Sequence, residues 1–462
     1  MLSELRERHP RFVYDSFQTE QREGELHIRF HFLLEPDVAF SPEIVVPVNS
    51  SLNQEEVENF AFHLGLVETI SYWKAACPKE IRVEAGRLNE EQVKWWHDLF
   101  IHGLGDFFYH NSIDFKMPNF FQIDSNLNKK SYLPSQQSAD NFGDLILVGG
   151  GKDSAITMEL LKKIPGRKGC LILNPIPSAL KTVEVAGYPE PLVVKRTIDP
   201  NLLRLNQEGY LNGHTPFSAY LAFLGVFIAT LHGYKHVIVG NDHSADEGNV
   251  KFRSMEINHQ YSKSFRFERL FREYCEKYLT PSVQYFSFIR PLWEIQVAQL
   301  FANYSKYHST FRSCNVGQKE NVWCGKCPKC VFVYISLFPF LSLEKMRKIF
   351  GEDYYLKPEV KPILRALTGL ERDKPFECVG TREESILAVG LAIRKYKEWG
   401  GEIPPLLLSL GKELGLLDDS KIIQLLENKL IRGWNDKNFL PEEYAKILKE
   451  ALENLKYERN FR

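Results

Sequence analysis

Leu147-Val148-Gly149-Gly150-Gly151-Lys152-Asp153-Ser154 is the most informative stretch of this sequence, because it joins an apolar run to a helical pattern. The apolar run is Asp144–Val148 and the helical pattern is Ile156–Lys163, which is typical of a strand followed by a helix. Three glycines let the backbone wrap closely around an anion, and the first N–H groups of the helix point toward it. The stretch therefore predicts a phosphate-binding turn, although it matches neither the ordinary P-loop nor the dinucleotide-binding fingerprint. Taken alone, it would also fit a simple turn.

Apolar runs and helical patterns alternate on both sides of this turn, over residues 144–343. Further apolar runs occur at Gly169–Leu173, Pro191–Val194 and His236–Val239. Continuous apolar strands separated by helices indicate a parallel sheet that is covered on both faces. The predicted fold class is therefore α/β, with a parallel sheet at its centre.

The two ends of the chain have different patterns. Residues 11–48 alternate apolar and polar residues, which predicts a small antiparallel sheet, and helical patterns follow at 53–76 and 89–108. The polar stretch 124–141 predicts a linker, and the sequence after residue 343 is helical and rich in Lys and Glu. We therefore expect three domains: an amino-terminal α+β domain (1–140), the α/β core (141–345) and a helical carboxy-terminal domain (346–462).

The composition is that of a folded protein: of 462 residues, 44% are hydrophobic and 25% are charged, which excludes wholesale disorder. Lys and Arg number 58 against 59 for Asp and Glu, a net charge of -1. This balance argues against nucleic-acid or membrane partners, so an acidic ligand needs a local pocket. The first ten residues carry charges where a signal peptide needs an apolar stretch, and no apolar run suits a membrane span. We expect a cytoplasmic protein.

Four of the eight cysteines fall in one short segment, Cys314-x9-Cys324-x2-Cys327-x2-Cys330. Four thiolates this close together suit tetrahedral Zn²⁺, and a site without an open position is structural. An iron–sulfur cluster and free buried thiols are the alternatives. We expect a structural zinc site in the core.

Three polar segments lie in the core: Gly213–Pro216, Gly240–Asn249 and Asn258–Ser264. The second follows an apolar strand, so on an open α/β sheet it lies at the carboxyl edge, where ligands bind. Each segment alone is compatible with an ordinary polar loop. Together, they predict ligand-binding loops around one crevice.

Gly149-Gly150-Gly151-Lys152-Asp153-Ser154 resembles the SGGxDS loop of the PP-loop ATP pyrophosphatases, with Gly149 where the family has its first Ser. The resemblance implies an adenine-nucleotide α-hydrolase-like fold. It also implies that Gly149, Gly150, Gly151, Lys152, Asp153 and Ser154 hold the β- and γ-phosphates of ATP, with Asp153 helping to hold Mg²⁺. The four-cysteine segment is similar to that of 7-cyano-7-deazaguanine synthase, which belongs to the same superfamily.

Taken together, the motifs resemble the UDP-N-acetylmuramoyl-L-alanyl-L-glutamate epimerase family. These are GGGKDS, GHTPFSA, GNDHSADEGN, NHQYSKS, RPLWE and SCN…WCGKCPKC, with further matches in residues 63–76 and 375–380. The resemblance implies ATP-dependent inversion of the terminal L-Glu of UDP-MurNAc-L-Ala-L-Glu to D-Glu in peptidoglycan synthesis. It also implies that an acyl-adenylate forms and that AMP and pyrophosphate are released. It therefore implies ATP as co-substrate, Mg²⁺, structural Zn²⁺ and a small-molecule substrate.

That chemistry suggests residues for each task. A proton carrier needs a pKa near neutrality, and the candidates are His214, His243, His259, Lys263 and Cys378. Mg²⁺ prefers oxygen ligands, and the candidates beside Asp153 are Asp242, Asp246 and Glu247. The uridine diphosphate end needs cations, and the candidates are Lys263, Arg253, Arg266 and Arg290. Spacing alone does not rank them.

Two other functions fit the sequence. One is a different PP-loop adenylating enzyme, similar to 7-cyano-7-deazaguanine synthase or to a tRNA-thiolating enzyme, although a neutral chain without a basic aromatic segment argues against tRNA. The other is a non-catalytic nucleotide-binding or zinc-dependent interaction protein, which the missing Ser of the loop suggests. The oligomeric state cannot be read from the sequence.

Overall fold

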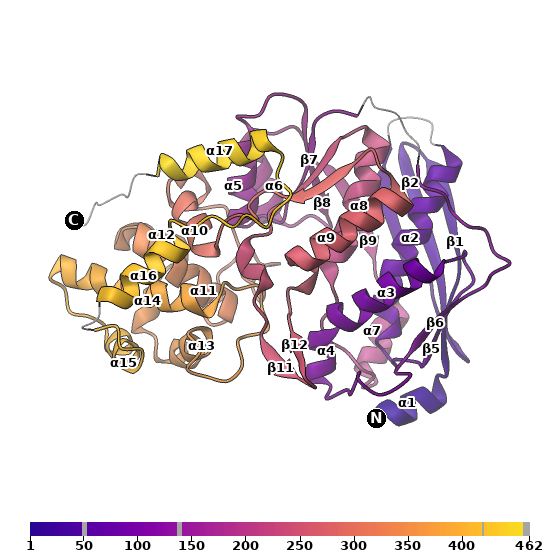
Figure 1. Ribbon diagram of the computed structural model, residues 1–462, viewed down its shortest axis with the longest axis horizontal. Coiled ribbons are helices and arrows are strands. Elements are labelled where there is room, and N and C mark those ends of the chain that lie inside the picture. The colour runs from indigo at the N-terminus through magenta and orange to yellow at the C-terminus, as the bar shows by residue number, and fades with distance from the viewer. Residues whose placement is uncertain (49–52, 136–140, 418–419, 456–462) are drawn as a thin grey trace.

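The computed structural model describes residues 1–48, 53–135, 141–417 and 420–455, and within them an eleven-stranded sheet is the largest element (Figure 1). Its strand order is β13-β10-β7-β8-β9-β4-β2-β1-β5-β6, with β3 paired to β2. A separate hairpin is formed by β11 (Val250–Phe252) and β12 (Met255–Ile257). The strands of the large sheet are β1 (Arg11–Arg22), β2 (Glu25–Leu34), β3 (Val38–Phe40), β4 (Glu43–Pro47), β5 (Glu80–Val83), β6 (Gln122–Ser125), β7 (Asp144–Leu147), β8 (Lys168–Leu173), β9 (Leu192–Thr197), β10 (His236–Val239) and β13 (Gln284–Ser287).

The five strands β13-β10-β7-β8-β9 are all parallel, which confirms the α/β fold class and its parallel sheet. Neighbouring residues of one strand enter different cores: Leu145 belongs to one buried hydrophobic cluster and Ile146 to the other. Both faces are therefore covered, as the continuous apolar runs predict. The chain order reverses between β7 and β10, so a crevice opens at the carboxyl ends of these two strands.

The amino-terminal strands extend this sheet. β1 and β2 pair antiparallel, as predicted, and β4 joins the parallel half by pairing antiparallel with β9. The antiparallel strands are therefore part of one large sheet. β6 includes residues 124 and 125 of the predicted linker, because it is an edge strand whose side chains are exposed or half-buried and its sequence is therefore polar. Residues 136–140 of that linker lie outside the described residues.

Helices cover both faces of the sheet and form the carboxy-terminal region. They are α1 (Leu2–Arg8), α2 (Gln54–Trp73), α3 (Glu90–Gly103), α4 (Gly105–His110), α5 (Lys152–Leu161), α6 (Pro177–Ala186), α7 (Pro200–Gln207), α8 (Phe217–His232), α9 (Phe265–Tyr274), α10 (Glu294–Ala302), α11 (Pro328–Leu337), α12 (Leu343–Phe350), α13 (Lys361–Leu367), α14 (Arg382–Trp399), α15 (Pro405–Glu413), α16 (Ser420–Leu430) and α17 (Glu442–Glu453). α2 begins where predicted, because the side chain of Asn53 accepts a hydrogen bond of 3.0 Å from the N–H of Glu55.

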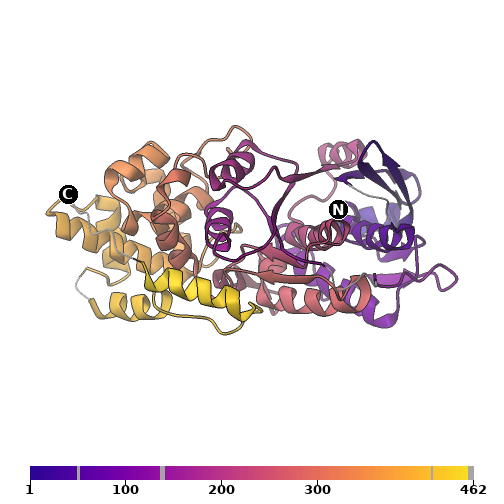
Figure 2. The ribbon, with the colours of Figure 1, turned by 90° about the horizontal axis from the view of Figure 1, so that it is seen from above.

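Two hydrophobic cores lie on opposite faces of the parallel strands. The first joins the amino-terminal strands to α2 and α8, with Phe60 and Phe227 stacked at 5.0 Å. The second joins the other face to α5, α10, α11 and the carboxy-terminal helices. Seen from above, the amino-terminal elements and the carboxy-terminal helices lie at opposite ends of the long axis (Figure 2). Among the described residues, none of the helices combines the length and the apolar character that crossing a membrane requires.

Candidate active site

The glycine turn, residues 149–154, connects β7 to α5 at the carboxyl edge of the parallel strands and includes the first three residues of α5. Gly150 has a φ of +80°, and a Cβ there would lie 2.6 Å from the backbone nitrogen of Ala179, so only glycine fits. A Cβ on Gly149 would meet no atom within 4 Å. The N–H of Gly149 donates to the hydroxyl of Ser154 at 3.1 Å, which closes the turn.

A cavity of 490 Å³, here called the main cavity, lies against this turn. Its apolar part is lined by residues from the ends of β8 and the start of α8, including Leu173, Phe217 and Leu221. Its polar part is lined by Gly149, Gly151, Asp153, Ser154, Lys263, Arg312, Ser313, Asn315, Lys329 and Cys378. The glycine turn and two of the predicted proton carriers therefore face the same space.

Lys152 does not line the main cavity. Its ammonium is 1% exposed and pairs with the carboxylates of Asp153, at 2.5 Å, and Glu294. Burial opposes its charge, but these carboxylates and Asp242 outweigh burial and raise the pKa of Lys152. The ammonium therefore acts within the protein, where it neutralises the carboxylates behind the turn.

Asp153 and Asp242 form a carboxylate pair beside the turn. Burial and the charge of Asp153 raise the pKa of Asp242 to about 6, and its Oδ1 accepts no hydrogen bond within the described residues. Burial also acts to raise the pKa of Asp153, but Lys152 and Lys329 bring it below its ordinary value. An unpartnered buried carboxylate oxygen next to a second carboxylate fits the oxygen ligands that Mg²⁺ prefers.

The other two predicted Mg²⁺ ligands have protein partners. Asp246 accepts a hydrogen bond of 2.7 Å from the N–H of Phe265 and lies 3.5 Å from His243. Glu247 accepts from the N–H of Arg382 at 3.1 Å and pairs with Lys374 at 3.0 Å. Neither residue lines the main cavity. Asp246 holds the loop after β10 against the start of α9, and Glu247 holds it against the start of α14.

Four of the five predicted proton carriers come together with a carboxylate that the sequence analysis missed. The ammonium of Lys263 lies 3.2 Å from the sulfur of Cys378, and Asp106 on α4 accepts from Nδ1 of His259 at 2.6 Å. The rings of His214 and His259 have centroids 4.1 Å apart. We call these five residues, Asp106, His214, His259, Lys263 and Cys378, the acid–base cluster.

The charges in this cluster depend on one another. Burial would raise the pKa of Cys378, but Lys263 and a hydrogen bond from His259 outweigh burial and hold it well below its ordinary value. Burial would lower the pKa of His259, but Asp106 and Cys378 raise it to about 9. Burial and the neighbouring His259 lower the pKa of His214 to about 3. Near pH 7, Cys378 is therefore a thiolate, His259 an imidazolium and His214 a neutral imidazole.

The fifth predicted proton carrier, His243, lies elsewhere. Its Nδ1 is 2.9 Å from the side-chain amide of Asn435, and its ring packs edge-on against Trp293. His243 does not line the main cavity and does not belong to the acid–base cluster. Its contacts link the loop after β10 to the carboxy-terminal segment.

The three arginines proposed for the uridine diphosphate end differ in exposure. Arg253 and Arg266 are each 50% exposed and pair with Asp114 and Asp98. Arg290 is fully buried: it donates to Glu268 at 3.1 Å, to the carbonyl of Asp242 at 2.6 Å and to the carbonyl of Lys263. Because its guanidinium is fully buried and bonds to their backbone carbonyls, Arg290 positions the loops that carry Asp242 and Lys263.

The four predicted zinc ligands do come together. The sulfurs of Cys314, Cys324, Cys327 and Cys330 all lie within 4.8 Å of one another, and those of Cys324 and Cys330 are 3.8 Å apart. A tetrahedron with Zn–S bonds of about 2.3 Å has sulfurs separated by roughly 3.8 Å. The N–H of Gly317 points at the sulfur of Cys314 at 3.0 Å. The donor set and its spacing fit Zn²⁺.

The four-cysteine segment also builds a wall of the main cavity. The N–H of Arg312 donates to the carbonyl of Gly150 at 3.1 Å, which attaches the segment to the glycine turn. Glu377 accepts from Asn315 and from the N–H of Lys329, each at 3.0 Å. The segment therefore fixes both the turn and the residue that precedes Cys378.

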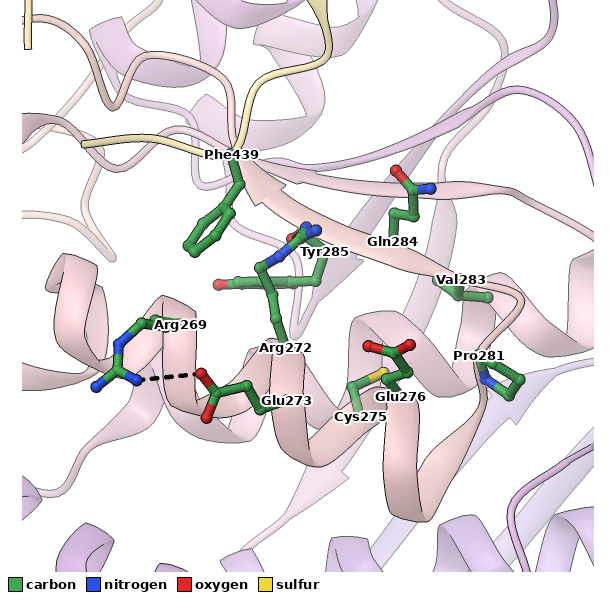
Figure 3. A pocket seen from close by; sticks show the side chains of 10 residues that line it. All are labelled: Arg269, Arg272, Glu273, Cys275, Glu276, Pro281, Val283, Gln284, Tyr285 and Phe439. Atoms are coloured by element: carbon green, nitrogen blue, oxygen red, sulfur yellow. Dashed lines mark hydrogen bonds and ion pairs between the residues drawn. The ribbon is translucent and has the colours of Figure 1, made fainter. Parts of the chain in front are cut away.

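A second cavity of 330 Å³ lies at the edge strand β13 and does not include the predicted site residues (Figure 3). Both of its arginines have partners: Arg269 pairs with Glu273 at 3.1 Å, and Arg272 donates to the carbonyl of Tyr285. Phe439 from the carboxy-terminal segment packs on Arg272 at 4.5 Å. We therefore place the chemistry at the main cavity.

Sequence reasoning gave no role to Asp106, Glu294 or Lys329. Glu294 belongs to the RPLWE motif and Lys329 to the CPKC motif, so both were visible as motif members. The available signal for Asp106 is a lone carboxylate between glycine and two phenylalanines, in Gly105-Asp106-Phe107-Phe108. A buried charge in such an apolar stretch needs a partner, and here the partners are His259 and His110, each 2.6 Å from a carboxylate oxygen of Asp106.

The fold and the site define an α/β protein with a glycine turn at the switch point of its sheet, a carboxylate pair and a four-cysteine site. The family model described as the MurL N-terminal domain matches residues 3–288, and the model described as the MurL C-terminal domain matches residues 307–409. The chain therefore belongs to the MurL family, as its motifs suggest.

Curated relatives agree with this assignment. A protein of Salinispora tropica is 32% identical over 397 residues, which cover 82% of this chain and 84% of the relative. Relatives from a Micromonospora species and from Xanthomonas oryzae pv. oryzae are 33% and 31% identical, and the matches cover 73% of this chain and 75% and 74% of the relatives. All three are named UDP-N-acetyl-alpha-D-muramoyl-L-alanyl-L-glutamate epimerase.

Proposed function

We propose that this protein inverts the terminal L-Glu of UDP-MurNAc-L-Ala-L-Glu to D-Glu, using ATP and releasing AMP and pyrophosphate. The names of the relatives support the epimerase activity and the substrate. The observation that supports the chemistry is that the glycine turn and the thiolate of Cys378 line one cavity. A nucleotide bound at the turn and a substrate carboxylate beside Cys378 would therefore meet.

In this proposal ATP lies along the carboxyl edge of the parallel strands, on a PP-loop-like core. The apolar part of the main cavity, with Leu173 and Phe217, suits an adenine ring, and the turn presents N–H groups to the phosphates. The open space at Gly149 leaves room for a phosphate oxygen. Ser313 and Asn315, from the four-cysteine segment, face the same space and supply polar groups.

Asp153 and Asp242 are our proposed Mg²⁺ ligands. Bound Mg²⁺ would neutralise charge on the phosphates. Without a cation, burial and Asp153 raise the pKa of Asp242, and one bound between these carboxylates would remove that repulsion. Lys152 balances the charge from the opposite side.

ATP is needed because a carboxylate resists loss of the neighbouring Cα proton. Adenylation removes the negative charge of the carboxylate, so the Cα–H becomes more acidic and a modest base can take the proton. Closure of the preceding Ala carbonyl onto the activated carbon would give an oxazolone, whose Cα–H is more acidic still. Inversion by this route needs no pyridoxal phosphate.

The acid–base cluster would move the proton. It places a proton donor beside a proton acceptor, because near pH 7 His259 is an imidazolium and His214 is a neutral imidazole. Pairs of groups whose environments move their pKa values apart are characteristic of acid–base catalysis. For the uridine diphosphate end we propose the exposed Arg253 and Arg266. ATP and UDP-linked precursors are cytoplasmic compounds, so the proposal places the reaction in the cytoplasm.

The proposal is tested by following the fate of ATP. With Mg²⁺ and UDP-MurNAc-L-Ala-L-Glu, ATP labelled on the α- or the γ-phosphate should give labelled AMP or labelled pyrophosphate, respectively. The variant Asp153→Ala should form no AMP, whereas Lys348→Ala, which removes an exposed ion pair with Glu344 on α12, is the control and should form AMP at the wild-type rate. Release of ADP and phosphate, or AMP formation at the wild-type rate by Asp153→Ala, would contradict the proposal.

A further inference from the structure

Cys378, His259 and Asp106 have the arrangement of an activated nucleophile. The thiolate of Cys378 receives a hydrogen bond from His259, and His259 is oriented by Asp106 at 2.6 Å. Lys263 adds a second cation, 3.2 Å from the sulfur. A nucleophile beside a base that a third group orients is the general signature of covalent catalysis.

The environment of Cys378 contrasts with that of the other cysteines outside the four-cysteine site. Burial raises the pKa of both Cys170 and Cys275 to about 12, so both remain thiols. Of the cysteines outside the four-cysteine site, Cys378 lines the main cavity. Reactive cysteines occupy accessible, electropositive places of this kind, whereas cysteines buried in apolar surroundings are inert.

The backbone around Cys378 is held on several sides. Its carbonyl accepts from the ammonium of Lys329, and the carbonyl of the next residue, Val379, accepts from Gln260 at 3.1 Å. Glu377 is fixed by Asn315 and Lys329. A nucleophile held in place beside its target loses little entropy on reaction.

We infer that Cys378 is an acyl acceptor: its thiolate takes the glutamyl group from the acyl-adenylate, and inversion occurs on the resulting thioester. This step rests on the proposed function, because it needs the adenylate as the acyl donor. It gives Cys378 a covalent role and leaves proton movement to the two imidazoles of the cluster.

The bonds balance without a further reactant. The sulfur of Cys378 attacks the acyl carbon, a C–S bond forms, and the bond between that carbon and the phosphate oxygen breaks with its electron pair on AMP. The Cα proton passes to an imidazole of the His214–His259 pair, and a proton returns to the opposite face. Water then adds to the thioester carbonyl, its two protons pass through an imidazole of the pair to solvent, the C–S bond breaks with its electron pair on sulfur, and Cys378 leaves as a thiolate. The D-glutamyl carboxylate is released.

The chemistry also favours this order of events. A mixed anhydride is a strong electrophile, and a thiolate is a strong nucleophile even when it is a weak base. A thiolate of low pKa is poorly suited to take a carbon-bound proton, but it reacts readily with an activated carbonyl. The thioester then keeps the carboxylate charge masked after AMP has been released, so the Cα–H stays acidic.

The intermediate can be trapped. Excess wild-type protein is mixed with ATP, Mg²⁺ and substrate carrying ¹⁴C in the Glu residue, quenched in acid and separated from small molecules under denaturing conditions. We expect ¹⁴C on the protein, no label from [α-³²P]ATP, and release by neutral hydroxylamine. Digestion should place the ¹⁴C on the peptide that contains Cys378. Cys170→Ala is the matched control and should keep the label.

The outcomes separate the two proposals. Formation of AMP and pyrophosphate without ¹⁴C on the protein at any quench time would overturn the thioester and leave the proposed function standing. No AMP from the wild type would overturn both.

A variant gives an independent readout. In Cys378→Ala we expect ATP–pyrophosphate exchange to continue, because the adenylate still forms, and AMP release to fall by ~100-fold or more. AMP release at the wild-type rate without inversion would mean that Cys378 only moves protons, and the acyl-acceptor role would be wrong. Folding is checked by zinc content and circular dichroism.

Discussion

At the scale of single residues, adjacent positions of the glycine turn have different requirements. Gly150 needs its left-handed backbone and its close approach to Ala179, whereas Gly149 has open space around its Cα. Gly149 is also the position at which the chain departs from the SGGxDS pattern. The departure therefore leaves the shape of the turn unchanged.

This difference predicts opposite outcomes for two small substitutions. Gly149→Ser should keep ATP turnover within a few-fold of the wild type, because no protein atom opposes the side chain and the SGGxDS loop carries a serine at this position. Gly150→Ala should lower kcat/KM for ATP by roughly tenfold or more, since the left-handed conformation alone costs about 1 kcal/mol and the contact with Ala179 adds to it. Steady-state kinetics with ATP as the varied substrate measure both. Equal activity of the two variants would contradict this account of the turn.

The pairing of Asp106 with His259 predicts a pH effect. Burial lowers the pKa of His259, but Asp106 and Cys378 outweigh burial and raise it to about 9. His214 is a further titratable group next to His259, with its ring 4.1 Å away. Activity that needs the imidazolium should fall as the pH rises through about 9. Asp106→Asn removes the charge that favours the imidazolium, so the alkaline limb of the pH–rate profile should move to lower pH. An unchanged limb would show that Asp106 does not set the protonation of His259.

The raised pKa of His259 also affects the stability of the folded protein. Because the folded-state pKa of His259 exceeds its unfolded value, its proton stabilises the native state. That contribution is complete below a pH of about 6.5, the ordinary value for histidine, and is lost as the pH rises through about 9. Urea denaturation of wild type and Asp106→Asn at pH 6 and pH 9.5 should therefore give a larger difference in unfolding free energy at pH 6.

At the scale of elements, the four-cysteine segment connects three parts of the site. It contacts the glycine turn through Arg312, the main cavity through Asn315, and the Cys378 loop through Glu377. α11 starts at Pro328, directly after Cys327, so its first turn also depends on the segment. A metal at the four cysteines would therefore shape the active site without reaching the substrate.

Loss of a zinc ligand should act through these connections. Cys327→Ser is expected to lose about one equivalent of metal and to reduce epimerase activity, because Lys329 and Asn315 are no longer fixed. Metal analysis by mass spectrometry, together with the activity assay, measures both effects. The buried Cys170→Ser, which lies outside the segment, is the control and should retain its zinc. Full zinc content in Cys327→Ser would refute the four-cysteine assignment.

At the scale of the whole molecule, the parallel strands lie between two cores, and the carboxy-terminal helix α17 closes the second one. The hydroxyl of Tyr444 on α17 donates at 2.7 Å to Asp144, the first residue of β7. Residues 300 positions apart are thereby joined in the buried core. The acid–base cluster likewise combines Asp106 of the amino-terminal part with Cys378 near the other end.

The Tyr444 contact predicts a stability difference between two buried tyrosines. Tyr444→Phe should lower the free energy of unfolding by about 1 to 3 kcal/mol, because Asp144 loses a buried hydrogen bond. The hydroxyl of Tyr355 makes no hydrogen bond within the described residues, so Tyr355→Phe should be close to neutral. Urea denaturation measures both, and a Tyr355→Phe loss equal to that of Tyr444→Phe would contradict the prediction.

Features whose residues lie close together in the sequence could be predicted, whereas features that depend on distant residues could not. The turn at Gly149–Ser154 and the four cysteines were recognisable because spacing within a short segment carries their chemistry. β13 was missed because its sequence, Gln284-Tyr285-Phe286-Ser287, has two apolar residues between two polar ones, whereas the equally short β7 and β10 each have three consecutive apolar residues.

Contacts between residues that are far apart in the sequence cannot be predicted from local patterns. Asp106 lies 153 residues before His259, and no local pattern connects them. The burial of Arg290 is also a property of the packed molecule, so its type and position in the sequence suggested a ligand contact instead. The three-domain division with boundaries at 140 and 345 stays a prediction, although one sheet crosses the first boundary.

The central claim is that ATP activation and inversion at Glu Cα belong to one reaction. The most direct measurement is incubation with UDP-MurNAc-L-Ala-L-Glu, ATP and Mg²⁺ in heavy water, followed by quantification of AMP, pyrophosphate and deuterium at Glu Cα. We expect D-Glu product that carries deuterium, with AMP and pyrophosphate formed in equal amounts and no inversion without ATP. AMP and pyrophosphate without inversion or deuterium, or inversion that proceeds without ATP, would contradict the account.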